Sequence, residues 1–221
     1  MSDVAERDES DSGRCGKVNT TKYRLSFTSG GLLTREAAVA APLYQRLGEW
    51  VEVRAALDAE NALQARTVAS GKRLSRELVQ RLAELTDEEI TLLVDATAIE
   101  RGHLMWAAAC RRYNLIGEFA EEVVRERFLL MTPTLSAEDF DSFVRAKSLW
   151  HEELAQLADS TLRKLRTNLF LMLRDAGIMT EPGHITQTVL SRSVAGVLAA
   201  RSPSDIRFFP AHGSSVGDGA R

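Results

Sequence analysis

Apolar residues recur at helical spacing along most of the chain, between two end segments in which they are scarce. Residues three and four apart share one face of a helix, and the strict alternation typical of half-buried strands is missing. The pattern therefore predicts an all-α, compact multi-helix globular fold. The one strand-forming stretch that we expect is a small β-hairpin near 178–186, where turn residues cluster.

Local start and stop signals divide this pattern into helices. Gly48 and Gly177 each follow an apolar helical stretch, and glycine readily adopts the left-handed conformation at which many helices end. Thr86 and Glu89 have capping-box spacing, in which the hydroxyl and the carboxylate satisfy each other's exposed helix-start amides. Ser136 is expected to cap the helix that follows it. These signals place helix boundaries independently of the apolar pattern.

Composition distinguishes the two ends from the body of the chain. Residues 1–20 are acidic and rich in Ser and Gly, and residues 211–221 are small, polar and Gly-rich. Neither end offers enough apolar surface to offset the entropy cost of ordering it, so we expect both to be disordered. The body divides into an N-terminal helical region, 21–135, and a C-terminal helical region, 136–210.

Charge, cysteine content and the length of the apolar runs indicate which partners and which cellular compartment to expect. The net charge of −3 argues against a protein that coats nucleic acid over its whole surface, but it allows local basic faces. Two cysteines, Cys15 and Cys110, make no disulfide framework, which fits a reducing cytoplasm. The apolar runs end far short of the ~20 residues needed to cross a bilayer. We therefore expect a soluble, cytoplasmic monomer with no membrane partner.

The usual sequence motifs of catalysis are missing. The chain has no CxxC or HExxH, no phosphate-binding glycine loop and no nucleophile elbow, and its four histidines are scattered. His151 beside Glu152 and Glu153 is a tempting group, but acidic residues in a first helical turn commonly stabilise the exposed amides. We expect no catalytic residues, no metal, no cofactor and no enzymatic activity.

The stretch "NALQARTVASGKRLSRELVQRL", residues 61–82, concentrates positive charge. Against one acid, Glu77, it carries five cations, namely Arg66, Lys72, Arg73, Arg76 and Arg81. On a helix over 71–85, four leucines fall within an arc of roughly 80° that must face the core: Leu74, Leu78, Leu82 and Leu85. The opposite side of that helix presents Lys72, Arg73, Arg76 and Gln80.

A second helix, over 49–64, is predicted just upstream. Val51, Leu57 and Leu63 are expected to face the core, and the polar connection "RTVASG" follows. Two helices joined by a short turn, the second with a basic face, meet the requirements of a helix-turn-helix that enters the DNA major groove. Residues 49–85 are therefore a first candidate motif.

A similar arrangement recurs near the C-terminus. The short helix "HEELAQL", a polar break at Asp159 and Ser160, and the longer helix "STLRKLRTNLFLMLRDAG" follow one another. One side of the longer helix is apolar, with Leu162, Leu165, Leu169, Phe170 and Leu173. The other side carries Arg163, Lys164, Thr167 and Arg174, with Arg166 at the border. This is a second candidate motif, and the segment after Gly177 is expected to act as its wing.

The outward side chains of both motifs suit DNA. Arginine and lysine neutralise phosphates, and one or two of them can reach base edges. The candidate DNA-binding residues are Arg66, Lys72, Arg73, Arg76, Gln80, Arg163, Lys164, Arg166, Thr167 and Arg174. Basic amphipathic helices are also common as merely solvated faces.

Two other functions remain open from the residues alone. One is a protein-interaction adapter with little intrinsic DNA affinity. The other is an RNA-binding helical module, although side chains cannot read the deep, narrow major groove of A-form RNA.

The sequence also resembles a known family. Residues 23–85, and above all "SFTSGGLL" and "NALQARTVASGKR", resemble the opening of the BrxA proteins of bacteriophage exclusion (BREX) systems. "YNLIGEFAEEVVRERFLL" and "DFDSFVRAKSLWHEELAQLADSTLRKLRTNLFLMLRDAGIM" are similar to the middle and C-terminal parts of the family. The resemblance covers roughly residues 22–210, including "RFFP" near the end.

The resemblance implies a small, all-helical, non-enzymatic component of a phage-defence system that binds double-stranded DNA through two helix-turn-helix motifs. Such a protein works beside an adenine methyltransferase, an ATPase and a phosphatase-like protein, and supports host DNA methylation and restriction of phage DNA. Carried onto this chain, the DNA contact falls on Lys72, Arg73 and Arg76 and on Arg163, Lys164 and Arg166. The acidic segment 1–20 lies outside the resemblance, and we expect it to compete with DNA if it covers a basic face.

Overall fold

The computed structural model describes residues 22–27, 31–211 and 216–217. Its helices are α1 Thr34–Leu47, α2 Trp50–Ala59, α3 Val68–Leu82, α4 Asp87–Asp95, α5 Ala98–Arg112, α6 Asn114–Phe119, the π-helix η1 Ala120–Arg125, α7 Glu126–Leu129, α8 Ala137–Lys147, α9 Glu152–Ala155, α10 Asp159–Asp175, α11 Arg192–Ala199 and the 3₁₀-helix η2 Asp205–Phe208. Its strands, each of two residues, are β1 Met179–Thr180, β2 His184–Ile185, β3 Leu190–Ser191 and β4 Val216–Gly217. The predicted all-α fold is confirmed. The predicted disorder of residues 1–20 lies outside the described residues.

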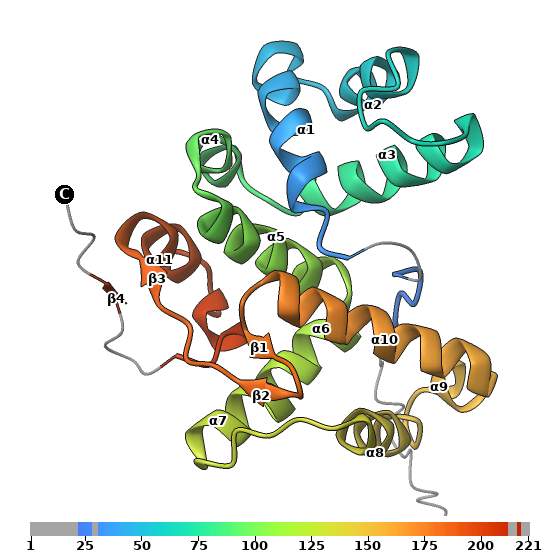
Figure 1. The fold of residues 1–221 in the computed structure, drawn as a ribbon, viewed down its shortest axis with the longest axis vertical. Helices are drawn as coiled ribbons and strands as arrows, with labels where there is room; N and C mark the ends of the chain where they lie inside the picture. The colour runs from blue at the N-terminus through green and yellow to red at the C-terminus, as the bar shows by residue number, and fades with distance from the viewer. Residues whose placement is uncertain (1–21, 28–30, 212–215, 218–221) are drawn as a thin grey trace, which may run out of the picture.

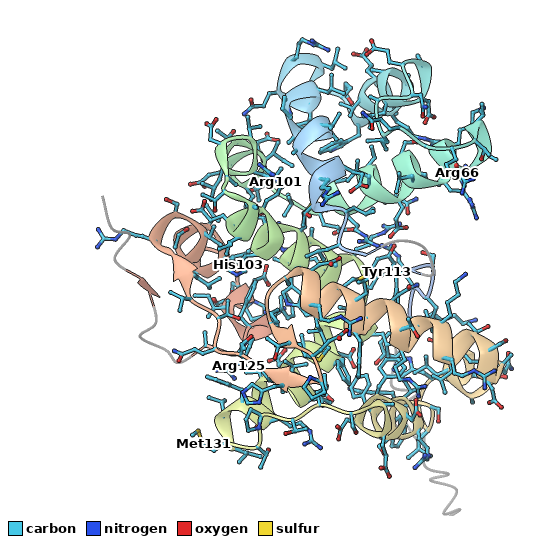
Figure 2. All side chains as sticks on the ribbon, viewed as in Figure 1. Arg66, Arg101, His103, Tyr113, Arg125 and Met131 are labelled. Carbon is cyan, nitrogen blue, oxygen red and sulfur yellow. The ribbon has the colours of Figure 1, made fainter. Side chains whose placement is uncertain are left out.

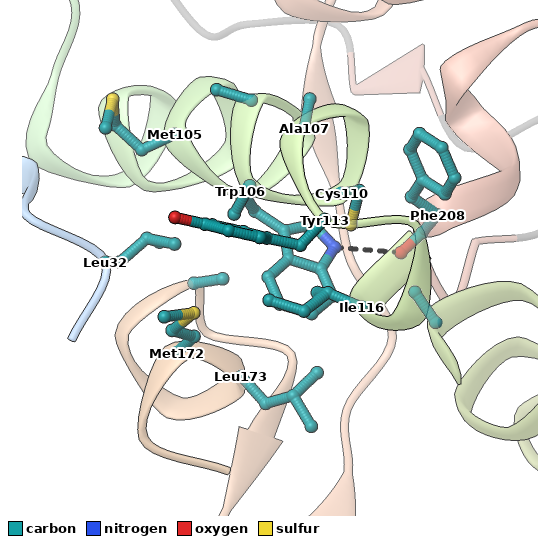
Figure 3. Packing of buried hydrophobic residues seen from close by; sticks show 14 of the residues in the cluster. Leu32, Met105, Trp106, Ala107, Cys110, Tyr113, Ile116, Met172, Leu173 and Phe208 are labelled. Carbon is teal, nitrogen blue, oxygen red and sulfur yellow. Dashed lines mark hydrogen bonds between the residues drawn. The ribbon is translucent and has the colours of Figure 1, made fainter. Parts of the chain in front are cut away.

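Helix α5 forms the centre of the molecule, with α1–α3 on one side and α8–α10 on the other (Figure 1). Residues 102–110 of α5 are all buried, because α1, α3, α6, α10 and α11 pack around it. The Trp106 indole fills this centre and donates a hydrogen bond to the Phe208 carbonyl at 3.0 Å (Figure 3). The two predicted helical regions therefore share one hydrophobic core.

The helix ends that the sequence predicts from a few neighbouring residues are confirmed. Gly48 follows α1 at φ 77°, and Gly177 follows α10 at φ 69°, both in the left-handed conformation that favours glycine. The Thr86 hydroxyl accepts from the Glu89 amide, and the Glu89 carboxylate accepts from the Thr86 amide. Ser136 likewise caps α8. A few residues thus determine each boundary.

Three predicted boundaries are wrong. Helix α3 covers 68–82 instead of 71–85, because Thr67 caps its start, and Leu85 is buried beyond its end. Helix α2 ends at Ala59, so residues 60–67 form the connection. The second break lies at 156–158, ahead of the expected Asp159 and Ser160, which begin α10.

The small β-hairpin predicted near 178–186 is confirmed. Strands β1 and β2 pair antiparallel, Met179 with Ile185 and Thr180 with His184. Residues 133–135, just ahead of α8, run along β2, since the Ile185 amide donates to the Pro133 carbonyl at 2.7 Å. The hairpin is therefore attached to the start of α8 as well as to the end of α10.

Strand β4 lies inside the predicted tail 211–221 and pairs in parallel with β3. The sequence does not predict this contact.

Within the part of the chain that the structure describes, no helix combines the length and the apolar character needed to cross a membrane.

Candidate nucleic-acid interface

The first unit, α2, its connection and α3 (residues 50–82), is held together by its own turn. The Asn61 side chain accepts from the Ala65 amide at 3.0 Å and donates to the Ala65 carbonyl at 3.2 Å. Thr67 and Ser70 then form a capping box, each hydroxyl accepting from the other residue's amide at 3.1 Å. The sequence prediction does not include this box, although two hydroxyl residues three apart are a recognisable signal. The start of α3 is thus fixed by side chains of the turn.

The predicted basic face of the first unit lies at the surface. Arg66, Lys72, Arg73 and Arg76 are exposed, and Gln80 is half-buried. No described carboxylate lies within 4 Å of any of these four cations. Figure 2 shows Arg66 projecting from the connection ahead of α3. Their charge is therefore available to a ligand.

Arg81, the fifth cation of this stretch, does not belong to the basic face. Its side chain is 0% exposed, and its Nε donates to Glu77 Oε1 at 2.8 Å. Its Nη1 donates to the Gly31 carbonyl at 2.8 Å, and the Tyr113 hydroxyl donates to Glu77 Oε1 at 2.5 Å. Burial raises the pKa of the Tyr113 phenol, and the bond to Glu77 raises it further. These four residues form a polar network inside the core that joins α3 to α5.

The second unit, α9, its connection, α10 and the hairpin (residues 152–185), presents fewer available cations. Arg163, Lys164 and Thr167 are exposed, and the Thr167 hydroxyl donates to the Arg163 carbonyl at 2.9 Å. The apolar side predicted for α10 packs inward: Leu165, Leu169 and Leu173 are buried and Leu162 and Phe170 are half-buried. The outward face of α10 is therefore basic at its first two turns.

Two predicted arginines of the second unit have carboxylate partners. Arg166 Nη1 contacts both oxygens of Asp141 on α8, at 2.8 and 2.6 Å. Arg174 Nε lies 3.9 Å from Glu181 Oε1 in the hairpin turn. Arg166 and Arg174 thus lie on α10 as predicted, but carboxylates of the protein neutralise part of their charge.

The two candidate helices share a direction. In Figure 1 the first residues of α3 and of α10 lie away from α5, on the same side of the molecule, and both helices run back toward the core. The N-terminal residues of a recognition helix are the ones that contact base edges. Both units therefore present the N-terminal end of their second helix on the same side of the molecule.

Another polar cluster, centred on Arg111, consists of internal ion pairs. Arg111 binds Glu89 at 2.5 Å and Asp205 at 2.6 Å, at the edge of a cavity of about 360 Å³. Burial alone would raise the pKa of Glu89, but the hydrogen bonds from Arg111 and Thr86 outweigh burial and leave it lowered. Among the described residues, no group of three or more His, Cys, Asp or Glu is placed to hold a metal ion. His151, as predicted, begins α9 as its N-cap.

Comparison with known proteins adds a family and a fold. The BrxA family model matches residues 21–202. The BREX protein BrxA of Paramagnetospirillum magneticum is 26% identical over 160 residues, which are 72% of this chain and 80% of that protein. The BREX protein BrxA of Escherichia coli O9:H4 is 27% identical over 153 residues, 69% of this chain and 72% of that one.

A solved structure has a similar fold. The crystal structure of an uncharacterized protein from Magnetospirillum magneticum matches with a TM-score of 0.75 and 23% identity, over 86% of this chain and 100% of that one.

Proposed function

Because this chain belongs to the BrxA family of BREX system components, we propose that it binds double-stranded DNA through two helix-turn-helix units and is not an enzyme. The observation that carries the proposal is the set of four exposed cations without a described carboxylate partner on the first unit, Arg66, Lys72, Arg73 and Arg76. Phosphate neutralisation by such side chains supplies essentially all of the sequence-independent affinity of DNA-binding proteins.

The geometry of α3 divides these cations by role. At 100° per residue, Arg76 lies between Lys72 and Arg73 on the outward face. With α3 in a major groove, the two flanking side chains face the phosphate rows on either side. The central Arg76 faces the base edges, where a guanidinium can bond guanine at two points.

The second unit has the order of a winged helix-turn-helix. Helix α8 precedes the unit, α9 and α10 follow α8, and the β1–β2 hairpin comes last and pairs with residues 133–135 ahead of α8. In the proposed function α10 enters a groove with Arg163 and Lys164 leading, and the hairpin contacts the adjacent backbone as a wing. Its two available cations give this unit the smaller share of the affinity.

The biological role that we propose follows from the family. As a BREX component, the protein acts with other BREX proteins, and DNA binding would serve host DNA methylation and restriction of phage DNA. The methyltransferase, the ATPase and the phosphatase-like protein of such a system are the proposed protein partners. We propose action in the cytoplasm, as a monomer, without a cofactor.

The test is fluorescence anisotropy of a labelled duplex of about 20 base pairs at several salt concentrations, since the slope of log affinity against log salt reports phosphate contacts. Arg73→Glu/Arg76→Glu and Arg163→Glu/Arg166→Glu should each weaken binding, the first pair by at least about tenfold. Arg35→Glu/Arg46→Glu on α1 makes the same change of charge at two exposed positions and should have a much smaller effect.

Two results would contradict the proposal. Absence of duplex binding at low salt would favour the protein-interaction adapter. Equal or tighter binding of an RNA duplex of the same sequence would favour the RNA-binding module, because A-form RNA does not admit a helix to its major groove.

A further inference from the structure

An extended segment passes between the two units. We call described residues 22–27 and 31–33 the strap, which crosses between α3 and α10 in Figure 1. Its first half is tied to the second unit: the Tyr23 amide donates to Glu153 Oε1 of α9 at 2.7 Å, and Asn168 Nδ2 of α10 donates to the Phe27 carbonyl at 3.0 Å. Tyr23 and Phe27 are both buried. The strap is therefore firmly held against the second unit.

The second half of the strap is tied to both units. The Gly31 carbonyl accepts from Arg81 of α3 at 2.8 Å, and the Leu32 amide donates to Asp175 Oδ2 at the end of α10 at 2.9 Å. Next to them, the Phe27 and Tyr113 rings pack with their centroids 5.2 Å apart. Tyr113, labelled in Figure 2, belongs to the polar network of α3. The strap thus occupies a fixed position between α3 and α10.

The strap lines a small basic cleft with the end of α5. Lys22, Arg24, Arg112 and Asn114 surround a cavity of about 150 Å³. Lys22 and Arg24 are exposed, and no described carboxylate lies within 4 Å of either. Arg112 Nη1 lies 3.5 Å from Glu84, while its Nε is buried without a hydrogen-bond partner among the described residues. Three cations thus face one cavity, and among the described residues a carboxylate contacts Arg112 alone.

The chemistry of this cleft fits one kind of ligand. Its volume equals that of a few water molecules, at about 30 Å³ each, which is room for a tetrahedral oxyanion. Arginine binds phosphate oxygens at two points, lysine contributes a compact charge, and the Asn114 amide is a neutral donor. Donors predominate around the cavity, so an anion is favoured over a cation or an apolar group.

We infer that this cleft, formed by Lys22, Arg24, Arg112 and Asn114, binds a backbone phosphate of DNA between the two units. The inference rests on the proposed function and deepens it. A phosphate held between α3 and α10 makes the two basic faces parts of one continuous surface. Because binding at one unit then raises the effective concentration of DNA at the other, a single duplex engages both.

The test compares Lys22→Ala/Arg24→Ala with wild type in the full-length chain. Both side chains are exposed, so an unchanged unfolding midpoint is expected. For each phosphate that the variant no longer neutralises, the slope of log affinity against log salt should become shallower by about 0.9. Arg35→Ala/Arg46→Ala removes the same two charges from α1 and serves as the matched control; its slope should stay close to that of wild type.

The outcomes separate this inference from the proposed function. If wild type binds the duplex and the strap variant changes the slope no more than the α1 control does, the strap cleft is overturned and the proposed function stands. If wild type does not bind the duplex, both fall. A shallower slope in the strap variant alone supports the cleft.

A second arm identifies the source of the phosphate. Inorganic phosphate is titrated into wild type and into the strap variant by calorimetry at constant ionic strength. Saturable binding to wild type alone, with no difference between the DNA slopes of the two proteins, would assign the cleft to a free anion and overturn the inference. Weak or absent binding of inorganic phosphate, together with the change in DNA slope, supports a backbone phosphate.

Discussion

The two units hold their second helices by different means. Helix α3 is anchored from inside by the buried Arg81–Glu77 pair and is capped by Thr67. Helix α10 packs on a stripe of leucines, begins after Ala158 without a side-chain cap, and pairs Arg166 with Asp141 near the surface. A buried ion pair has strict geometry, whereas leucines tolerate small rotations. The rotation of α3 about its axis, and hence the direction of its basic face, is therefore more tightly determined than that of α10.

Breaking the buried Arg81–Glu77 pair should reduce stability more than any other change proposed here. Arg81→Ala leaves Glu77 buried without its charge partner and should lower the free energy of unfolding by about 3–5 kcal/mol. Arg166→Ala in the second unit removes a partly exposed pair and should cost less than about 1 kcal/mol. Urea unfolding followed by far-UV circular dichroism measures both.

A control separates loss of charge balance from loss of packing in the first unit. Replacing both partners, Glu77→Leu/Arg81→Met, leaves no isolated charge and should recover much of the stability lost in Arg81→Ala, apart from the unpaired Tyr113 hydroxyl. A cost for Arg81→Ala no greater than that for Arg166→Ala would show that the two helices are anchored equally.

The next effect compares two arginines on DNA. Arg76 is exposed without a described carboxylate partner, whereas Arg166 is bonded to Asp141. Arg76→Ala should therefore weaken duplex binding by about 1–3 kcal/mol, the range for a base-reading arginine. Arg166→Ala should change binding less, because its charge is already matched. Anisotropy titrations at one salt concentration decide the order, and a larger loss at Arg166 would make the second unit the principal one.

Helix capping gives a smaller effect, of opposite sign in the two units. Thr67→Ala removes the hydroxyl that accepts from the Ser70 amide and should destabilise the protein by about 1 kcal/mol. Ala158→Asp introduces a cap at the start of α10 and should stabilise it by up to about 1 kcal/mol. Thermal unfolding measures both, and Ala69→Ser, at the exposed second residue of α3, is a neutral control. Equal effects of the same sign would mean that the two helix starts do not differ.

The sequence predicts features of this fold whose causes are local. The caps at Thr86 and Ser136, the stop at Gly48 and the hairpin each depend on a few consecutive residues. The outward positions of Lys72, Arg73 and Arg76 also follow from helical periodicity, because the leucines of α3 determine which side faces inward. Such predictions need no knowledge of distant contacts.

Other features depend on partners far along the chain. The sequence analysis places Arg81 among the cations of the basic stretch. In the structure Arg81 is buried beside Gly31 and Tyr113, and the only sequence signal of its ion pair is the four-residue spacing to Glu77. Val51 is predicted to face the core but is 81% exposed, because the neighbours of α2 cover its other side. The strap cleft escapes prediction for the same reason, since it joins residues 22 and 24 to 112 and 114. Periodicity determines a face of a helix but not which neighbour covers it.

The smallest change in affinity is expected when Arg166 of the second unit is released from its carboxylate partner. Asp141→Asn preserves the shape of the side chain but removes the carboxylate that holds Arg166 at 2.6 Å. If α10 contacts DNA, the released guanidinium and the lost negative charge should raise duplex affinity about two- to threefold, and more at low salt because the effect is electrostatic.

Stability should fall by less than about 1 kcal/mol, as for other exposed pairs. Asp95→Asn at the end of α4, outside both units, is the matched control, since it removes the same negative charge at an exposed position without releasing an arginine. A rise in affinity at Asp141 alone would mean that the second unit contacts DNA and is restrained by its own ion pair. No rise, or a fall, would mean that α10 is held away from the duplex, so that the first unit and the strap carry the interaction.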